Sequence, residues 1–128
     1  MSDDVIEPRL TRFIEEHVGS VAELDLLLFL REHSQTEWAA KEAAQALRGE
    51  ADWTRRQLDD LCSRGFVMAR PGAEVRYRYS PSSEVEQLVA DLARLYRERP
   101  VRTLTLIYSR PRNQIHSFAD AFRLKKEK

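Results

Sequence analysis

The sequence contains a single cysteine, only four glycines and no long apolar run. Cys62 cannot form an internal disulfide, which fits a reducing compartment. Its position close after Leu58 and Leu61 indicates a small buried apolar group rather than a reactive thiol. No apolar run approaches the roughly 20 residues that a membrane-spanning helix needs, and the N-terminus lacks the basic start of a secretory signal. We therefore expect a cytoplasmic protein.

Recognisable catalytic motifs are also missing from the sequence. It has no glycine-rich phosphate loop, no H-E-x-x-H and no G-x-S-x-G. His17, His33 and His116 lie far apart along the chain, and none has metal-ligand spacing with Cys62. We expect no enzymatic activity, no metal site and no cofactor.

The charge of the chain is balanced overall but unevenly distributed. The 128 residues, of which 42% are hydrophobic and 33% charged, suit one ordinary globular domain. Residues 1–50 hold five basic and eleven acidic side chains, whereas residues 51–128 hold sixteen and ten. Thirteen of those sixteen are arginine, which suits bidentate contact with phosphate or carboxylate groups. The back half is therefore either a solvated basic surface or a surface for an anionic partner.

Helical spacing of apolar residues predicts four helices before residue 66. A short leading helix begins near Pro8, and Ser20 with Glu23 forms a capping box that opens a second, strongly apolar helix. An alanine-rich helix follows and should end at Gly49. Asp52 is a plausible N-cap for the fourth helix, and Gly65 a C-cap. The residues expected to face inward are Leu10, Phe13, Ile14 and Val18 in the first helix; Leu24, Leu26, Leu27, Leu28, Phe29 and Leu30 in the second; Trp38, Ala39, Ala43, Ala46 and Leu47 in the third; and Thr54, Leu58, Leu61 and Cys62 in the fourth.

A β-hairpin is predicted after the fourth helix, because "FVMAR" and "VRYRYSP" flank the turn residues Pro71 and Gly72. In the stretch "EVRYRYSP" an arginine alternates with an apolar or aromatic residue. Successive side chains of a strand point to opposite faces, so one face should carry Val75, Tyr77 and Tyr79, and the other the two arginines.

The remainder of the chain is predicted to be helical. Ser83 and Glu86 form a second capping box at the start of a long helix that runs to about Arg99. Residues 100–109 fit either a strand or a helix, and we favour a short helix that begins at Pro100. Residues 114–124 form an amphipathic pattern through Ile115, Phe118, Ala119 and Phe122, which indicates helix packing.

This order of elements resembles the winged helix-turn-helix domain of bacterial transcriptional regulators. The residues that carry the resemblance are "AAKEAAQAL" and "WTRRQLDDLCSRGFV" as the two helices and "MARPGAEVRYRYS" as the wing. The resemblance covers about residues 20–80. It implies a mainly α fold with a small β-hairpin, in which residues 1–19 are a leading helix, 20–81 the winged helix-turn-helix domain and 82–128 a C-terminal helical extension.

The resemblance also implies DNA binding and assigns roles to particular residues. The second helix of such a motif enters the major groove, and the wing contacts the backbone or the minor groove. The side chains that would carry DNA binding are Trp53, Arg55, Arg56 and Gln57 on the helix, and Arg70, Arg76 and Arg78 on the wing. Arginine can recognise guanine, and glutamine adenine, through two hydrogen bonds.

The acidic residues of the proposed reading helix keep another interpretation open. Asp52, Asp59 and Asp60 lie on the proposed reading helix, where carboxylates would repel phosphates. The alternative function is a protein-interaction module that docks on an acidic partner without binding DNA. We also expect a homodimer through the leading and C-terminal helices, because many regulators of this fold bind palindromic sites as two-fold dimers.

Overall fold

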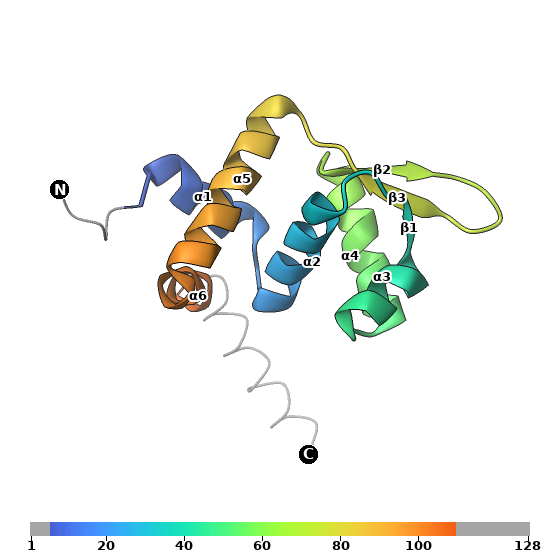
Figure 1. The fold of residues 1–128 in the computed structure, drawn as a ribbon, viewed down its shortest axis with the longest axis horizontal. Helices are drawn as coiled ribbons and strands as arrows, with labels where there is room; N and C mark the ends of the chain where they lie inside the picture. The colour runs from blue at the N-terminus through green and yellow to red at the C-terminus, as the bar shows by residue number, and fades with distance from the viewer. Residues whose placement is uncertain (1–5, 110–128) are drawn as a thin grey trace, which may run out of the picture. The chain divides into compact units, whose positions relative to one another are not determined.

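The computed structural model describes residues 6–109, which form six helices and a three-stranded antiparallel sheet. The elements are α1 (Pro8–His17), α2 (Val21–Glu32), β1 (Trp38–Ala39), α3 (Ala40–Leu47), α4 (Ala51–Ser63), β2 (Val67–Arg70), β3 (Arg76–Tyr79), α5 (Ser83–Glu98) and α6 (Pro100–Tyr108). Figure 1 labels them along the ribbon. The mainly helical fold with one β-hairpin that the sequence predicts is therefore confirmed. The amphipathic segment at residues 114–124 lies outside the described residues.

The chain divides into two compact units. Among the described residues, one unit runs from Ala22 to Ala90, and the other combines residues 6–21 with residues 91–109. The domain limits expected from the sequence, at residues 19 and 81, stay a prediction. Within the described part of the chain, no helix is long and apolar enough to cross a membrane.

In the unit that combines the two ends of the described chain, α1 packs against α6. The apolar face expected for the leading helix is buried as predicted, and its members are Leu10, Phe13, Ile14 and Val18. Residues 100–108 are a helix rather than a strand, with Pro100 in its first turn. Thr103 and Ile107 are its fully buried residues, whereas Val101 is 76% exposed and Tyr108 65% exposed.

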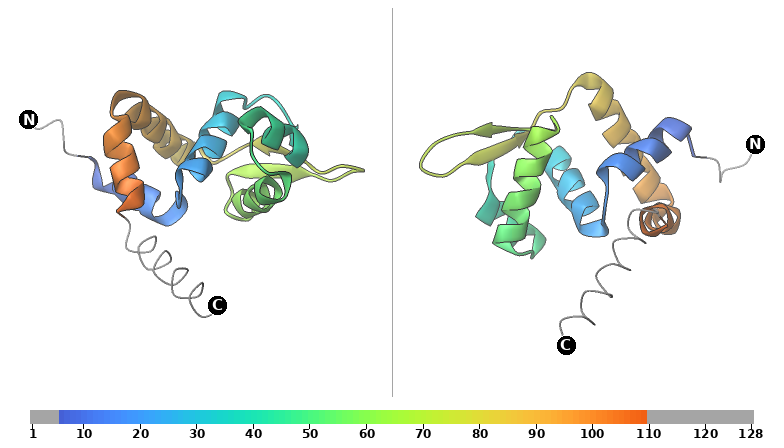
Figure 2. Two further views of the ribbon diagram at one scale, coloured as in Figure 1. Left: turned by 90° about the horizontal axis from the view of Figure 1, so that it is seen from below. Right: turned by 180° about the vertical axis from the view of Figure 1, so that it is seen from behind.

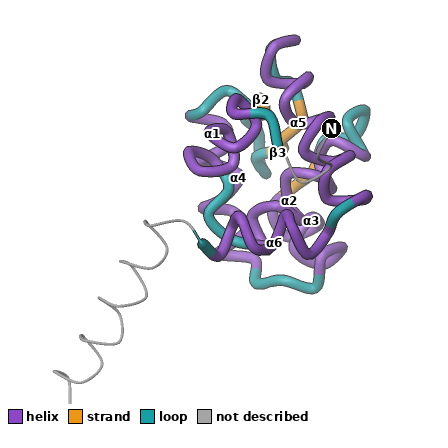
Figure 3. Tube along the Cα trace, turned by 90° about the vertical axis from the view of Figure 1, so that its left-hand side faces the viewer, coloured by secondary structure: helices purple, strands orange, loops and turns teal. Residues whose placement is uncertain are grey.

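The unit from Ala22 to Ala90 contains α2, α3, α4 and all three strands of the described residues, which are orange in Figure 3. The helix α4 packs against both α3 and β2. The strands lie in the order β1-β3-β2, so that β3 is central and pairs with both neighbours in antiparallel fashion. The β2–β3 hairpin extends away from the helices in Figures 1 and 2.

The first strand is absent from the sequence-based expectation. Trp38 and Ala39 were assigned to the alanine-rich helix, but they form β1 and pair with Tyr77 and Arg76. Helix α3 begins only at Ala40. A two-residue strand depends on a partner almost forty residues later in the chain, so local spacing cannot reveal it.

The buried face of α3 also differs in detail from the prediction. Ala43 and Ala44 are buried, whereas Ala46 is exposed. The helix ends at Leu47, and Arg48 rather than Gly49 has the left-handed conformation, with a φ of 56°. The Gly49 N–H donates to the Ala44 carbonyl at 2.8 Å and completes the cap.

Two further caps show where the sequence signals succeed and fail. Gly65 has a φ of +86°, and the Phe66 N–H donates to the Leu61 carbonyl, which confirms the predicted glycine cap of α4. At the start of α5, however, the Ser82 hydroxyl accepts a hydrogen bond from the Val85 N–H. The predicted capping box of Ser83 and Glu86 is therefore wrong by one residue.

Candidate nucleic-acid interface

The exposed side of α4 is determined by the residues that the helix buries. Thr54, Leu58 and Leu61 are buried, as their spacing predicts. Arg55 and Arg56 are consequently exposed, and neither makes a hydrogen bond or ion pair with a described residue. They occupy the first two turns of the helix, which the resemblance assigns to base contacts.

The other two residues predicted on this helix are less accessible. Trp53 and Gln57 are half-buried, so only part of each side chain faces solvent. Cys62 is also half-buried, rather than fully buried as expected.

The N-terminus of α4 is capped differently from the prediction. Glu50 is the N-cap and makes no side-chain cap hydrogen bond, whereas Asp52 lies inside the first turn. The Thr54 hydroxyl donates to the Glu50 carbonyl at 2.8 Å, which satisfies this buried side chain within the helix. Asp52 is therefore not the cap, but its carboxylate still lies at the end of the helix that favours negative charge.

Both aspartates in the middle of α4 have a partner within the protein. The Tyr77 hydroxyl donates to the Asp59 carboxylate, and the Arg64 guanidinium forms an ion pair with Asp60. Burial and the hydrogen bond to Asp59 raise the pKa of Tyr77 to about 12. Both aspartates remain exposed, and only Asp60 is paired with a positive charge, so the objection that these carboxylates face a phosphate backbone is weakened for Asp60 alone.

The alternation of the hairpin is largely as the sequence predicts. Tyr77 and Tyr79 are buried on one face of β3, and Arg78 is exposed on the other. Val75 was expected to join the tyrosines, but it precedes the strand and is 42% exposed. Val75 is therefore a loop residue, to which the alternation of the strand does not apply.

Within the unit from Ala22 to Ala90, Tyr79 connects the hairpin to α2 and to the first part of α5. Its hydroxyl donates to Glu86 of α5 at 2.7 Å, and Glu86 also accepts hydrogen bonds from the Arg31 guanidinium of α2 at 3.1 to 3.3 Å. Burial and the hydrogen bond to Glu86 raise the pKa of Tyr79 well above its ordinary value. Glu86 thus serves as the shared acceptor that fixes β3 to both helices.

The three wing arginines are not equivalent. Arg70 forms an ion pair with Glu37, and Arg76 forms ion pairs with Glu42 and Glu74. Arg78 makes no hydrogen bond or ion pair with a described residue. Sequence reasoning missed Glu37 and Glu42 as partners, because they precede these arginines by more than thirty residues and no local pattern relates them.

The structure thus brings the predicted residues into one unit, because α4 packs against β2 and β2 pairs with β3.

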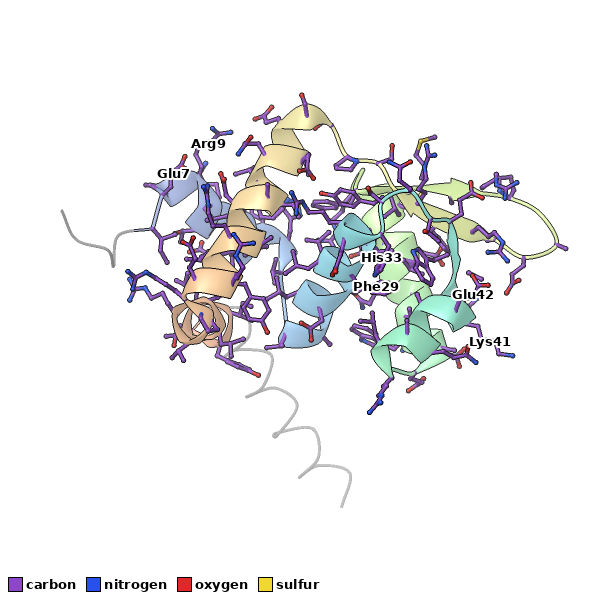
Figure 4. All side chains as sticks on the ribbon, viewed as in Figure 1. Glu7, Arg9, Phe29, His33, Lys41 and Glu42 are labelled. Atoms are coloured by element: carbon purple, nitrogen blue, oxygen red, sulfur yellow. The ribbon has the colours of Figure 1, made fainter. Side chains whose placement is uncertain are left out.

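The described residues do not form a metal site. In residues 6–109 no three histidine, cysteine, aspartate or glutamate side chains are placed to hold a metal ion. His33 instead packs against Phe29 and Trp38, with ring centroids 4.8 and 5.7 Å away. Figure 4 labels Phe29 on α2 and His33 immediately after the end of that helix. His116 lies outside the described residues.

The fold is similar to solved structures of bacterial transcription regulators. MepR in the Staphylococcus aureus MepR-DNA complex matches with a TM-score of 0.57 and 12% identity, over 94% of this chain and 88% of that chain. MepR described as a transcription regulator of the S. aureus multidrug efflux pump MepA matches with a TM-score of 0.55 and 16% identity, over the same shares. Wild-type MarR from E. coli, in its apo form, matches with a TM-score of 0.55 and 16% identity, over 91% of this chain and 83% of that chain.

No protein-family model and no curated protein sequence matches the chain. The similarity to MepR and MarR therefore rests on three-dimensional structure, and at this level of identity it establishes the fold. The chain has the winged helix-turn-helix fold of these regulators, with α3 and α4 as the helix-turn-helix and the β2–β3 hairpin as the wing.

Proposed function

We propose that the chain is a DNA-binding transcriptional regulator that reads duplex DNA with α4. The observation that carries the proposal is the exposure of Arg55 and Arg56 on the second helix of the motif, where neither has a hydrogen-bond or ion-pair partner among the described residues. An α-helix fits the major groove, and arginine can bind the two acceptor atoms of guanine there. The similarity in fold to MepR, which has been solved in complex with DNA, supports the same conclusion.

The other residues of the interface make different contacts with DNA in this proposal. Gln57 follows the arginines by one residue and can contribute an adenine contact through the exposed part of its side chain. Trp53 lies two residues before Arg55 and contributes only the exposed part of its half-buried side chain. Arg78 on the wing contacts phosphate or the adjacent minor groove, which positions the protein on the duplex.

The proposed regulator is a bacterial, cytoplasmic protein without catalytic activity. MepR and MarR are bacterial proteins, and MepR is described as a transcription regulator. The absence of catalytic motifs from the sequence agrees with this assignment.

We propose in addition that the protein is a homodimer through its leading and C-terminal helices. Support comes from α6, on which Val101 and Tyr108 are large apolar residues that are 76% and 65% exposed. A two-fold dimer would present two copies of α4 to the two halves of a palindromic site. Light scattering should give about twice the chain mass for the unchanged protein, and the variant Val101→Glu/Tyr108→Glu should dissociate.

The experiment that tests the function is a comparison of arginine variants on a set of duplexes. Arg55→Ala and Arg56→Ala should each lower affinity for a preferred duplex by about 1–3 kcal/mol and reduce discrimination between sequences. Arg97→Ala is the matched control, because Arg97 is exposed on α5 outside the unit that contains α4. Equal effects of all three substitutions would contradict the assignment of base contacts to α4.

A further inference from the structure

The outward face of the wing carries a pair of like charges. Arg70 and Arg76 are direct cross-strand partners in the β2–β3 ladder, and Met68 and Arg78 form another partner pair two residues along. Directly opposite residues lie on the same face of an antiparallel pair, so these four side chains share one surface. Two arginines in this arrangement repel each other and would destabilise the hairpin.

The repulsion is offset by carboxylates that precede the wing in the chain. The Nε atom of Arg70 donates to both carboxylate oxygens of Glu37, at 3.0 and 3.1 Å. The Nη2 atom of Arg70 also donates to Glu37 Oε1, so two nitrogens of the guanidinium hold the carboxylate. Glu37 lies immediately before β1, so the contact ties the outer end of β2 to the segment that leads into α3.

Arg76 is held at two points of the same segment. Its guanidinium donates to Glu42 Oε1 at 3.0 Å and to the Glu37 carbonyl at 3.4 Å. Its backbone pairs with Ala39 in β1, and its side chain is only 34% exposed. A third carboxylate, that of Glu74, lies 3.8 Å from the same guanidinium.

Glu42 is itself fixed in position by the main chain. Its Oε1 accepts the Ala39 N–H at 3.0 Å, and this bond, together with Arg76, lowers the pKa of the Glu42 carboxyl. Glu42 is labelled at the beginning of α3 in Figure 4. The carboxylate therefore remains charged at neutral pH and connects the first turn of α3 with the wing.

We propose that Arg70 and Arg76 are positioning residues, which hold the wing on the segment from Glu37 to Glu42 and leave Arg78 as the arginine of the wing that contacts the DNA backbone. The second half of this statement rests on the proposed function. The two arginines face three carboxylates, so the outer end of the β2–β3 ladder has no excess of positive charge to attract phosphate. Arg78 has no such partner in the described residues.

The positioning role is tested first in the DNA-free protein, by hydrogen exchange of the backbone amides in residues 67–79. Arg70→Gln, Arg76→Gln and Glu37→Gln should each speed this exchange about two- to fivefold, which corresponds to the loss of one exposed ion pair. The double variant Arg70→Gln/Glu37→Gln should exchange no faster than the faster single variant, because the two residues act through one contact. Arg78→Gln is the matched control and should leave the exchange unchanged.

The same variants should give the opposite pattern in the salt dependence of DNA binding. Each phosphate contact contributes about 0.9 to the slope of log affinity against log salt concentration. Arg78→Gln should therefore lower the slope by about one, whereas Arg70→Gln and Arg76→Gln should leave it unchanged.

The outcomes separate this inference from the function on which it rests. A decrease of the slope by about two in Arg70→Gln/Arg76→Gln would show that both arginines bind phosphate and would overturn the inference. Exchange that is as fast in Arg78→Gln as in Arg76→Gln would also overturn it. If the unchanged protein binds no duplex, the proposed function fails, while the exchange pattern still supports or refutes the positioning role.

Discussion

Replacement of Glu86 by alanine should destabilise the protein far more than replacement of another surface glutamate. The Tyr79 hydroxyl, on a residue that is only 8% exposed, would lose its acceptor, and Arg31 would lose its ion pair. A hydrogen bond to a charged group contributes about 1.5–3 kcal/mol. The ion pair adds at most about 1 kcal/mol, because the two side chains are 33% and 39% exposed and solvent screens them.

We therefore expect Glu86→Ala to lower the free energy of unfolding by about 2–3 kcal/mol. In a Tyr79→Phe background the same substitution should cost only about 1 kcal/mol, since the hydroxyl is already gone. Urea denaturation of the two single variants and the double variant measures this coupling. Glu98→Ala, at an exposed site on the same helix, should change stability by less than about 0.5 kcal/mol. A coupling below about 0.3 kcal/mol would refute the role given to Glu86.

Three other substitutions test separate parts of the structure. Gly65→Ala should cost about 1–2 kcal/mol in urea denaturation because Gly65 has a φ of +86°, whereas Gly72→Ala should be nearly neutral, since its added Cβ would meet only ordinary contacts. Leu58→Ala should cost about 2–5 kcal/mol by the same assay, because Leu58 is 0% exposed in the core beneath α4. The raised pKa of Tyr77, about 12 against 10.0 in an unfolded chain, should make the protein lose stability as pH rises from 10 to 12. Between pH 8 and pH 11.5 the free energy of unfolding should fall by about 2 kcal/mol less in Tyr77→Phe than in the unchanged protein. Equal falls in the two proteins would contradict the assignment of Tyr77 as a buried, neutral side chain.

The parts of the fold that the sequence predicts are those encoded by local signals. The buried set on α1 follows from helical spacing, and the end of α4 from a glycine followed by Phe66. The hairpin follows from Pro71 and Gly72 between the segment "FVMAR" and the alternating segment "VRYRYSP". In each case the residues that decide the structure are within a few positions of one another, so their pattern is visible before any tertiary contact is known.

The features that the sequence does not reveal depend on distant residues or on single positions. Trp38 and Ala39 form a strand only because β3 is available to pair with them. At the start of α5, Ser82 and Ser83 offer the same side chain, and the course of the chain after β3 decides which of them caps the helix. Tertiary contacts outweigh local preference at both places.

The candidate interface likewise has features that the sequence predicts and features that it does not reveal. The exposure of Arg55 and Arg56 could be predicted, because three buried residues on α4 determine which side of the helix faces solvent. The pairing of Arg70 with Glu37 could not, because 33 residues separate them and only the folded wing brings them together. The composition shows that residues 51–128 are basic, but only the folded structure shows which wing arginines are already paired with carboxylates.

The central claim is that the unit containing α4 and the wing binds duplex DNA. Its most direct test is fluorescence anisotropy of the unchanged protein with a pool of labelled duplexes, including the region upstream of its own gene, at two salt concentrations. We expect tight binding to at least one duplex, with affinity that falls steeply as salt rises. Absence of binding even at low salt would contradict the claim and would direct attention to an acidic protein partner.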